Sequence, residues 1–381
     1  MRTRLRAGFA ACVLAAAALL ASPTMAGAAR PAALFTVESR SDVVAAGVAN
    51  SALVRVDAAV VSPETEVIEI PLGDQVVRAV RHHTEITGSG GNAWFGGVDG
   101  APPSDSLEAV TLIRHGDQVT GTVAHGGVAY TLRPTSDGGH VFDEVDYATM
   151  PPSRHAAPTG EPDSLTVGVS VGVTVVRVLV AASAQASTVP DLRGLAELAI
   201  ALANRGFANN RLAIKFELAG VLPTDYDERG FDKDLSALRA GRVGGVDAKR
   251  DEVKADVVSM LVRRNGNCGL GFIKATAKTA FSVVNTDCAR ANFSLAHEIG
   301  HNFGADHDAA NEAGGYQYGH GHVVPGRFRT IMSYPCPAAC PRINYWSSPL
   351  VTYQGQVLGN AETSDNARVM RERAATVAAF R

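Results

Sequence analysis

The feature that most constrains this chain of 381 residues is a stretch of twelve, residues 297–308, which reads HEIGHNFGADHD. It holds three histidines, a glutamate and a glycine in the order H-E-x-x-H-x-x-G-x-x-H, which is the spacing of a three-histidine zinc site. His297 and His301 are four residues apart, so a helix places both imidazoles on one face. Gly304 permits a sharp turn after that helix, and the turn returns His307 to the metal as the third ligand.

Glu298 directly follows the first histidine, so we expect its side chain to stand beside the metal instead of binding it. A catalytic zinc site has three protein ligands and one position for water, and a carboxylate next to that position can act as general base. The motif therefore predicts one catalytic zinc ion in an enzyme that hydrolyses peptide bonds. The alternative, a helix with ordinary surface histidines, requires five fixed positions to coincide by accident.

A second motif lies downstream, where residues 330–334 read TIMSY. We interpret it as a methionine turn beneath the metal, in which Met332 packs under the ligands and takes no part in the chemistry. Because three histidines complete the protein ligands, we interpret Asp308 as a structural carboxylate and not as a ligand.

Residues 1–28 have the pattern of an export signal. Three arginines precede an apolar run over residues 8–20, and alanines at positions 26 and 28 suit a signal peptidase. The run is shorter than the roughly 20 residues that a permanent membrane anchor needs. We therefore expect a secreted protein, extracellular or periplasmic; a membrane-anchored protein is the alternative.

Four cysteines follow the signal: Cys268, Cys288, Cys336 and Cys340. An even number in an exported protein favours disulfides, although four cysteines allow three pairings. We favour Cys268–Cys288 and Cys336–Cys340, because each pair closes a local loop. Thiolate metal ligands are the alternative, and the absence of a second closely spaced pair in the sequence argues against them.

The net charge is −3, and no long run of one sign occurs. This balance indicates neither nucleic acid nor a membrane as partner. We expect a monomer whose partners are protein or peptide substrates and its own N-terminal region. Calcium is compatible with such an enzyme, but nothing in the sequence supports a calcium site.

The chain divides by composition. Residues 29–150 alternate short apolar runs with glycine-containing turns, as in a meander of hairpins, and we interpret them as a small β-rich pro-domain. A retained β-rich binding module is the alternative. Residues 151–167, rich in proline and small polar residues, form a linker, and residues 168–381 form the catalytic domain.

Within 168–381 the patterns predict a mixed α/β (α+β) domain. We expect a first helix from Leu192 that Gly206 closes, an active-site helix over 291–303, an irregular stretch over 309–360, and a last helix capped by Ser364. The expected strands cover residues 174–180, 212–218, 255–262 and 280–284.

With both motifs in hand, the sequence resembles the metzincin zinc peptidases in their reprolysin-like branch, and there it is similar to the secreted bacterial peptidyl-Asp metalloendopeptidases. Cys268-Gly269 and the run DNAR at 365–368 add to the resemblance, which covers roughly residues 168–381. It implies a twisted, mostly parallel five-stranded sheet, two major helices above a cleft, and cleavage on the amino side of aspartate.

Two departures from that pattern matter. No cysteine lies between residues 29 and 267, so a thiolate cannot hold the zinc in a latent form, and latency would need another ligand or steric cover. Tyr334 follows Met332 by two residues, as in astacins and serralysins. It is either a fifth ligand, a hydrogen-bond donor to the oxyanion, or an aromatic packed near Tyr345 and Trp346.

A preference for aspartate requires a cation in the specificity pocket. Arg327, Arg329 and Arg342 bracket the methionine turn and are the candidates, although each could be an ordinary surface arginine. His320 and His322 are either extra metal ligands or, as we favour, loop residues.

Two other functions compete with this interpretation: an adhesion or binding protein with a vestigial protease domain, and a zinc peptidase of other specificity. Degenerate proteases usually lose the glutamate or a histidine, and all are present here. If the chain matures by cutting itself, the linker offers an aspartate at the Pro162–Asp163 bond.

Overall fold

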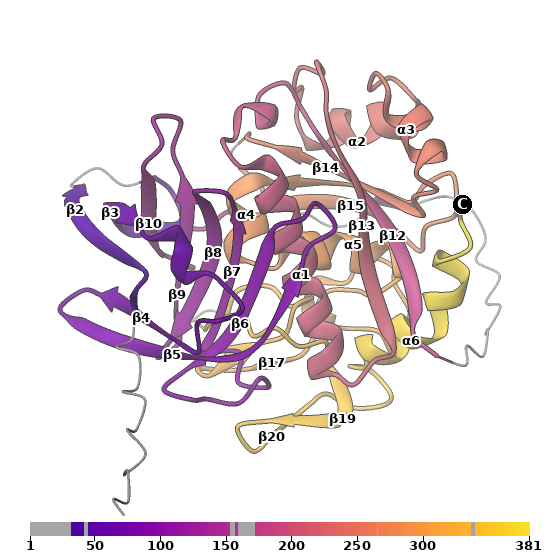
Figure 1. Cartoon of the computed structure of the whole chain (residues 1–381). Helices are drawn as coiled ribbons and strands as arrows, with labels where there is room; N and C mark the ends of the chain where they lie inside the picture. Colours follow the sequence, from indigo (N-terminus) through magenta and orange to yellow (C-terminus); the bar gives the residue numbers. More distant parts are fainter. Residues whose placement is uncertain (1–31, 42–44, 153–156, 159–171, 265, 337–339) are drawn as a thin grey trace, which may run out of the picture. The chain divides into compact units, whose positions relative to one another are not determined.

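Two large β-sheets dominate the computed structural model of the chain (Figure 1). The structure describes residues 32–41, 45–152, 157–158, 172–264, 266–336 and 340–381. The export signal and the Pro162–Asp163 bond lie outside these ranges. None of the helices that the structure describes is both long enough and apolar enough to cross a membrane.

The N-terminal sheet has ten strands within the described residues, in the order β1-β4-β5-β6-β7-β8-β9-β10-β3-β2. The strands are β1 (Ala32–Ala33), β2 (Phe35–Ser41), β3 (Val48–Val56), β4 (Val67–Leu72), β5 (Gln75–Ile86), β6 (Asn92–Val98), β7 (Ala109–His115), β8 (Gln118–His125), β9 (Val128–Pro134) and β10 (His140–Val145). The meander expected from the sequence is present, because strands β4 to β10 pair with their chain neighbours in antiparallel register. Gly116, at φ 58°, makes the tight turn between β7 and β8.

The second sheet has the order β11-β15-β16-β14-β12-β13. Its strands are β11 (Ala157–Pro158), β12 (Thr174–Ala182), β13 (Ile214–Pro223), β14 (Val257–Val262), β15 (Gly269–Ile273) and β16 (Phe281–Asn285). The sheet thus has six strands among the described residues instead of the expected five, because the two-residue β11 from the linker joins its edge. The pairs β12–β13, β12–β14 and β14–β16 are parallel, whereas β15 runs antiparallel to β16.

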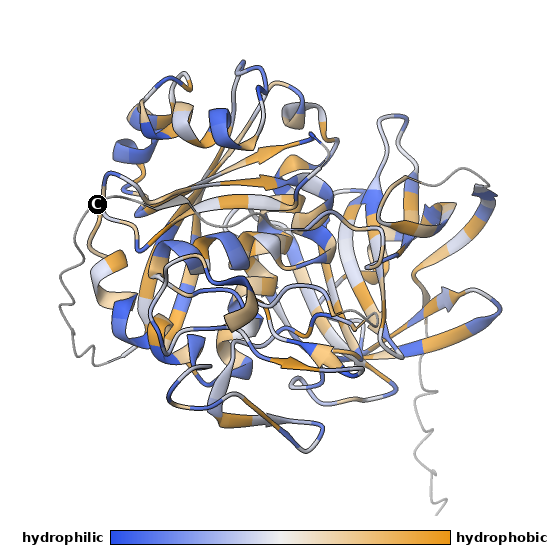
Figure 2. Ribbon diagram, turned by 180° about the vertical axis from the view of Figure 1, so that it is seen from behind, coloured by the Kyte–Doolittle hydropathy of each residue, from blue (hydrophilic) through white to orange (hydrophobic). Residues whose placement is uncertain are grey.

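Helices cover both faces of the second sheet. They are α1 (Leu192–Asn209), α2 (Phe231–Arg239), α3 (Val246–Glu252), α4 (Thr286–Ala291), α5 (Ser294–Phe303) and α6 (Asn366–Val377). Alternate residues of β12 point to opposite faces: Val178 and Val180 pack with α1, α5 and α6, whereas Leu179 and Ala181 pack with α2 and α3 (Figure 1). Hydrophobic residues are accordingly concentrated along the strands between the two helix layers (Figure 2).

Several boundaries differ from those expected. α1 does not close at Gly206 but continues to Asn209; a Cβ at position 206 would lie 2.7 Å from Asn344 Oδ1, so this glycine serves close packing. The cap of α6 is Asp365 and not Ser364, because the Asp365 carboxylate accepts from the Arg368 amide. The active-site helix begins at Ser294, since the separate α4 precedes it. Where the structure describes it, the irregular stretch contains the short strands β17 (Val323–Val324), β18 (Phe328–Arg329), β19 (Ser348–Tyr353) and β20 (Gln356–Leu358).

The N-terminal sheet contacts α1 through a buried polar cluster. His115, at the end of β7, lies 3.0 Å from the Glu197 carboxylate and 3.4 Å from the Asp191 carboxylate. Thr120 donates to Asp191 at 2.8 Å, and Ser89 donates to Glu197 at 2.5 Å. Hydrogen bonds to Asp191 and then Glu197 raise the pKa of His115 to about 9. Although burial acts to raise them, the hydrogen bonds from His115 lower the pKa values of both carboxyl groups.

We predict that this cluster makes the folding stability depend on pH. Because the pKa of His115 is raised in the folded chain, its contribution is complete below the ordinary value of 6.5 and is lost as pH rises through about 9. The melting temperature of the wild type should exceed that of His115→Gln most at pH 6, and the difference should shrink toward zero by pH 10. A difference between the two proteins that does not change with pH would contradict the charged pairing.

Candidate metal centre

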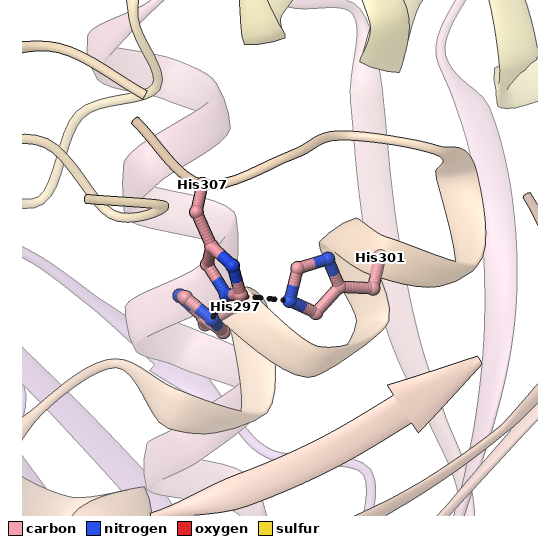
Figure 3. Close-up of side chains that lie close together, drawn as sticks. All are labelled: His297, His301 and His307. Carbon is pink, nitrogen blue, oxygen red and sulfur yellow. Dashed lines mark hydrogen bonds between the residues drawn. The ribbon is translucent and has the colours of Figure 1, made fainter. Parts of the chain in front are cut away.

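Three histidine side chains, two of them on α5, meet at one point (Figure 3). His297 and His301 project from α5, and His307 comes from the loop that follows it. The Nε2 atom of His307 lies 3.2 Å from Nε2 of His297 and 3.0 Å from Nε2 of His301. All three side chains are fully buried. The sequence motif thus brings together its three expected ligands, and the described residues contain no other such group of potential metal ligands.

Each imidazole is held at its other nitrogen by a backbone carbonyl. The Nδ1 atoms of His297, His301 and His307 lie 2.9, 2.9 and 3.1 Å from the carbonyl oxygens of Ile331, Ala305 and Asn311, respectively. A carbonyl accepts only, so each Nδ1 carries the proton and each Nε2 presents a lone pair.

This arrangement fits a metal ion. Three lone pairs pointing at one another repel unless a cation lies between them. Nitrogen ligands of a tetrahedral ion at 2.0–2.1 Å lie about 3.3 Å apart, close to the separations observed here. Burial, and then the charges of His301 and Arg342, lower the pKa of His297 well below its ordinary value, so this imidazole is neutral as a ligand must be.

Glycines shape the helix that carries two of these ligands. Gly304 ends α5 in the left-handed conformation, at φ 102°, and turns the chain toward His307 as expected. Gly300 lies between the ligands, where a Cβ would approach Trp346 to 2.9 Å and the Met332 sulfur to 3.0 Å. The buried Met332 therefore packs against α5 at Gly300, which lies between His297 and His301 in the sequence.

Glu298 lies beside the cluster and has no hydrogen-bond partner among the described residues. Its side chain is fully buried, and its Oε1 atom lies 3.9 Å from Nε2 of His297. Strand β15 passes directly over it, because a Cβ at Gly269 would come within 2.4 Å of Oε1. Burial raises the pKa of Glu298 well above that of an ordinary glutamate, which makes its carboxylate a strong proton acceptor.

Carboxylates and an amide that face away from the metal hold the site together. Asp308 accepts from the Tyr334 amide at 2.9 Å, so it joins the His307 loop to the methionine turn. Asp306 and Asn302 were not foreseen. Asp306 accepts from three backbone amides of the loop, including that of His307 at 2.7 Å, and Asn302 donates to the Phe272 carbonyl of β15. Both fall inside the zinc motif, but their roles depend on segments distant in sequence.

Tyr334 packs against a ligand. Its ring centroid lies 4.5 Å from that of His307, with the two rings tilted by 52°. Trp346 stacks on Phe207. Burial, with the charges of Glu298 and Asp308, raises the pKa of Tyr334 to about 12, which keeps the phenol protonated at neutral pH.

The remaining candidates separate into surface and buried residues. Nδ1 of His320 lies 3.0 Å from the His307 carbonyl, and His322 is outside the cluster, so both are loop residues and not ligands. Arg327 is exposed and donates to Gln354. Arg329 and Arg342 are buried against the methionine turn, where both donate to the Ser333 carbonyl.

Both local disulfides are present. Cys268–Cys288 joins the residue before β15 to α4, with a Cα–Cα distance of 5.3 Å. Cys336–Cys340 closes a short loop after the methionine turn, with a Cα–Cα distance of 5.7 Å. The first link therefore anchors the strand that lies over Glu298.

Several known proteins are similar to this chain. A family model described as metallo-peptidase family M12B, reprolysin-like, matches residues 172–363. A peptidyl-Asp metalloendopeptidase of Xanthomonas campestris is 37% identical over 359 residues, which are 87% of this chain and 86% of that protein. One of Stenotrophomonas maltophilia is 38% identical over 86% of both chains. The solved metalloproteinase-II from Bacteroides fragilis aligns with a TM-score of 0.42 at 11% identity over 73% of this chain and 87% of its own, a likeness too distant to support an argument.

We predict unequal contributions of the two disulfides to stability. Loop closure over 20 and 4 residues corresponds to about 3 and about 2 kcal/mol, respectively. Urea unfolding of Cys268→Ser/Cys288→Ser should therefore show the larger loss, compared with Cys336→Ser/Cys340→Ser as the matched control. Peptide mapping without reduction should find these two links alone, and any link between the two loops would refute the pairing.

Proposed function

This chain belongs to the reprolysin-like metallopeptidase family M12B, and from that premise we propose that it is a secreted zinc endopeptidase that cuts on the amino side of aspartate residues. One observation carries the proposal: three buried imidazole Nε2 atoms converge beside a buried carboxylate that has no hydrogen-bond partner in the described part of the chain. Three neutral nitrogen ligands and no thiolate match the donor set of a catalytic zinc ion.

The residues divide the chemical work. Zinc, when bound by the three imidazoles, supplies the positive charge that acidifies water and polarises the scissile carbonyl. Glu298 accepts the proton of the attacking water and delivers it to the leaving amine, for which its raised pKa is suited. The Tyr334 phenol, next to His307, donates a hydrogen bond to the oxygen that becomes negative.

Relatives and sequence support the remaining parts of the proposal. The similar proteins of Xanthomonas and Stenotrophomonas are peptidyl-Asp metalloendopeptidases. The signal-like residues 1–28 and the two disulfides are typical of an exported protein. A binding protein with a vestigial protease domain is not favoured, because the three histidines and Glu298 are intact and assembled.

We also propose that residues 29–150 are a pro-domain that keeps the enzyme latent by steric cover. The segment after the N-terminal sheet lies along β15: the Pro152 carbonyl accepts from the Cys268 amide at 2.9 Å, and β11 pairs with Phe272 and Ile273 in parallel. Extended peptides commonly bind proteins by adding a strand to a sheet edge. The linker therefore occupies the edge nearest Glu298, and no cysteine is needed for latency.

The central test is cleavage of a denatured protein mixture by purified, zinc-loaded enzyme. Mass spectrometry should find new N-termini that begin with aspartate, and a zinc chelator should abolish them. His301→Ala should lose both zinc and activity, and Glu298→Ala should keep about one zinc per chain and lose turnover by a factor on the order of 10³ or more.

His322→Ala is the matched control, because this histidine lies near the methionine turn but outside the cluster. It should keep both zinc and activity. A zinc-loaded wild type that cuts no peptide bond would refute the proposed function, and cleavage without preference for aspartate would refute the specificity alone.

A second prediction concerns maturation. If the enzyme cuts its own linker, N-terminal sequencing of secreted protein should find a start near residues 150–170 for the wild type and an uncut chain for Glu298→Ala. Asp163→Asn should slow or move the cut, because it removes the aspartate of the linker. Trimming of the Glu298→Ala protein at the same bond, in the absence of other proteases, would show that the enzyme does not process itself.

A further inference from the structure

Two arginines are buried next to the methionine turn. Arg329 and Arg342 are 2% and 3% exposed. Their guanidinium groups converge on the Ser333 carbonyl oxygen, at 2.7 Å from Nη1 of Arg329 and 2.9 Å from Nη2 of Arg342. Arg342 also donates to the Asn292 carbonyl at 2.8 Å. Among the described residues, no carboxylate lies within ion-pair distance of either group, and the Nε atom of each has no hydrogen-bond partner.

Such a pair is unfavourable for folding alone. Burial lowers the pKa of Arg329 to about 10, and burial with the charge of Arg329 lowers the pKa of Arg342 well below its ordinary value. Buried charges in proteins are normally paired, because removing an ion from water costs several kcal/mol. Two adjacent arginines that share one carbonyl therefore form a site with a surplus of positive charge, which a bound anion would complete.

Arg342 is also in the right place to contact a substrate. Its hydrogen bonds join Asn292, just before α5, to Ser333, which lies between Met332 and Tyr334. Together with Phe293, it lines one side of a small cavity of about 40 Å³ that is partly open to solvent. Residues of the N-terminal sheet, such as Thr111 and Thr122, line the other side. The amide of His297 bonds to the Phe293 carbonyl, so the cavity begins one helical turn from the first ligand.

The other arginines near this cavity fit less well. Arg290 also lines it, but its charge is compensated by Asp287 at 2.6 Å. Arg205 lies on α1 and donates to the Pro103 carbonyl, away from the methionine turn. Arg327 is exposed and bound to Gln354. Among these arginines, Arg342 with Arg329 behind it combines an uncompensated charge with contact to the methionine turn.

We propose that Arg342, supported by Arg329, binds the side-chain carboxylate of the aspartate that follows the scissile bond. This inference rests on the proposed function and names the residue responsible for its specificity. Guanidinium N–H groups pair with carboxylates in strong charged hydrogen bonds. Two backbone carbonyls hold the guanidinium group of Arg342, so its position in the pocket is fixed. A substrate with asparagine in place of aspartate would have the same shape but would leave the charge of Arg342 uncompensated.

The N-terminal region covers this site in the intact chain. Tyr147, from the segment after β10, lines the same cavity and donates to the Ala291 carbonyl at 3.2 Å. Its phenol lies near enough to Arg329 and Arg342 to influence the pKa of each. Removal of the proposed pro-domain would thus open the cavity to a substrate side chain.

The test compares two peptides that differ only in aspartate or asparagine after the scissile bond. Enzyme expressed from the full coding sequence and zinc-loaded should favour the aspartate peptide in kcat/KM by a factor on the order of 10³ or more. Arg342→Gln should reduce this ratio to about 1, whereas Arg342→Lys, which keeps the charge, should retain part of it. Arg327→Gln is the matched control and should leave the ratio unchanged.

The outcomes separate the two proposals. Equal loss of both activities in Arg342→Gln, with the ratio intact, assigns Arg342 a structural role and overturns the inference while the proposed function stands. A wild type that cuts neither peptide overturns both. If the Arg342 variants do not fold, a crystal structure of Glu298→Ala with the aspartate peptide decides, because the peptide carboxylate must lie within hydrogen-bond distance of the Arg342 guanidinium, and any other position refutes the assignment.

Discussion

The three hydrogen bonds between imidazole Nδ1 atoms and backbone carbonyls are the constraint on which the rest of the site depends. The acceptors are Ala305 and Asn311, in the loop that follows α5, and Ile331, in the methionine turn. Each bond sets the tautomer and the ring orientation of one histidine, so the three Nε2 lone pairs converge. Three local structures position those carbonyls: the methionine turn, the tight turn at Gly304 and the loop around Asp306.

Burial without compensation characterises the groups around that cluster. Glu298 is a carboxylate with no hydrogen-bond partner among the described residues, and Arg342 is a cation bound only to carbonyls there. Both cost folding free energy. In the proposed enzyme, each is completed by the reactants: Glu298 by the proton of the attacking water, and Arg342 by the carboxylate of the substrate. The groups that the proposed reaction needs therefore destabilise the fold. The Cys268–Cys288 disulfide and the packing of Met332 stabilise this region.

The N-terminal sheet meets the catalytic region in two chemically different ways. A buried charged cluster around His115 joins it to α1, and apolar residues such as Phe95 and Ile113 pack on Leu198 and Leu202. The linker instead adds backbone hydrogen bonds to the edge of β15. The first contact depends on titratable groups, and the second can be removed by cutting the chain, which is compatible with a region that is retained until maturation.

The sequence by itself predicted the three-histidine group, the adjacent glutamate, the methionine turn and the local disulfides, because each rests on spacing within one segment. His297, His301 and Glu298 share one helix, and Gly304 dictates the turn that returns His307. The hairpins of the N-terminal sheet could also be predicted, because short apolar runs alternate there with glycine-containing turns, and neighbouring strands pair in antiparallel register. Strand β15 could not be predicted from the sequence, because Gly269 and Gly271 interrupt any strand pattern. Helices α2 and α3 could not be predicted either, because these short helices depend on tertiary packing. Only the tertiary structure decided which arginine is buried without an ion pair among the described residues. It also decided how Tyr334, Asp306 and His320 contact the His307 segment. The physical reason is that these contacts join segments whose proximity is not encoded by the spacing of residues along the chain.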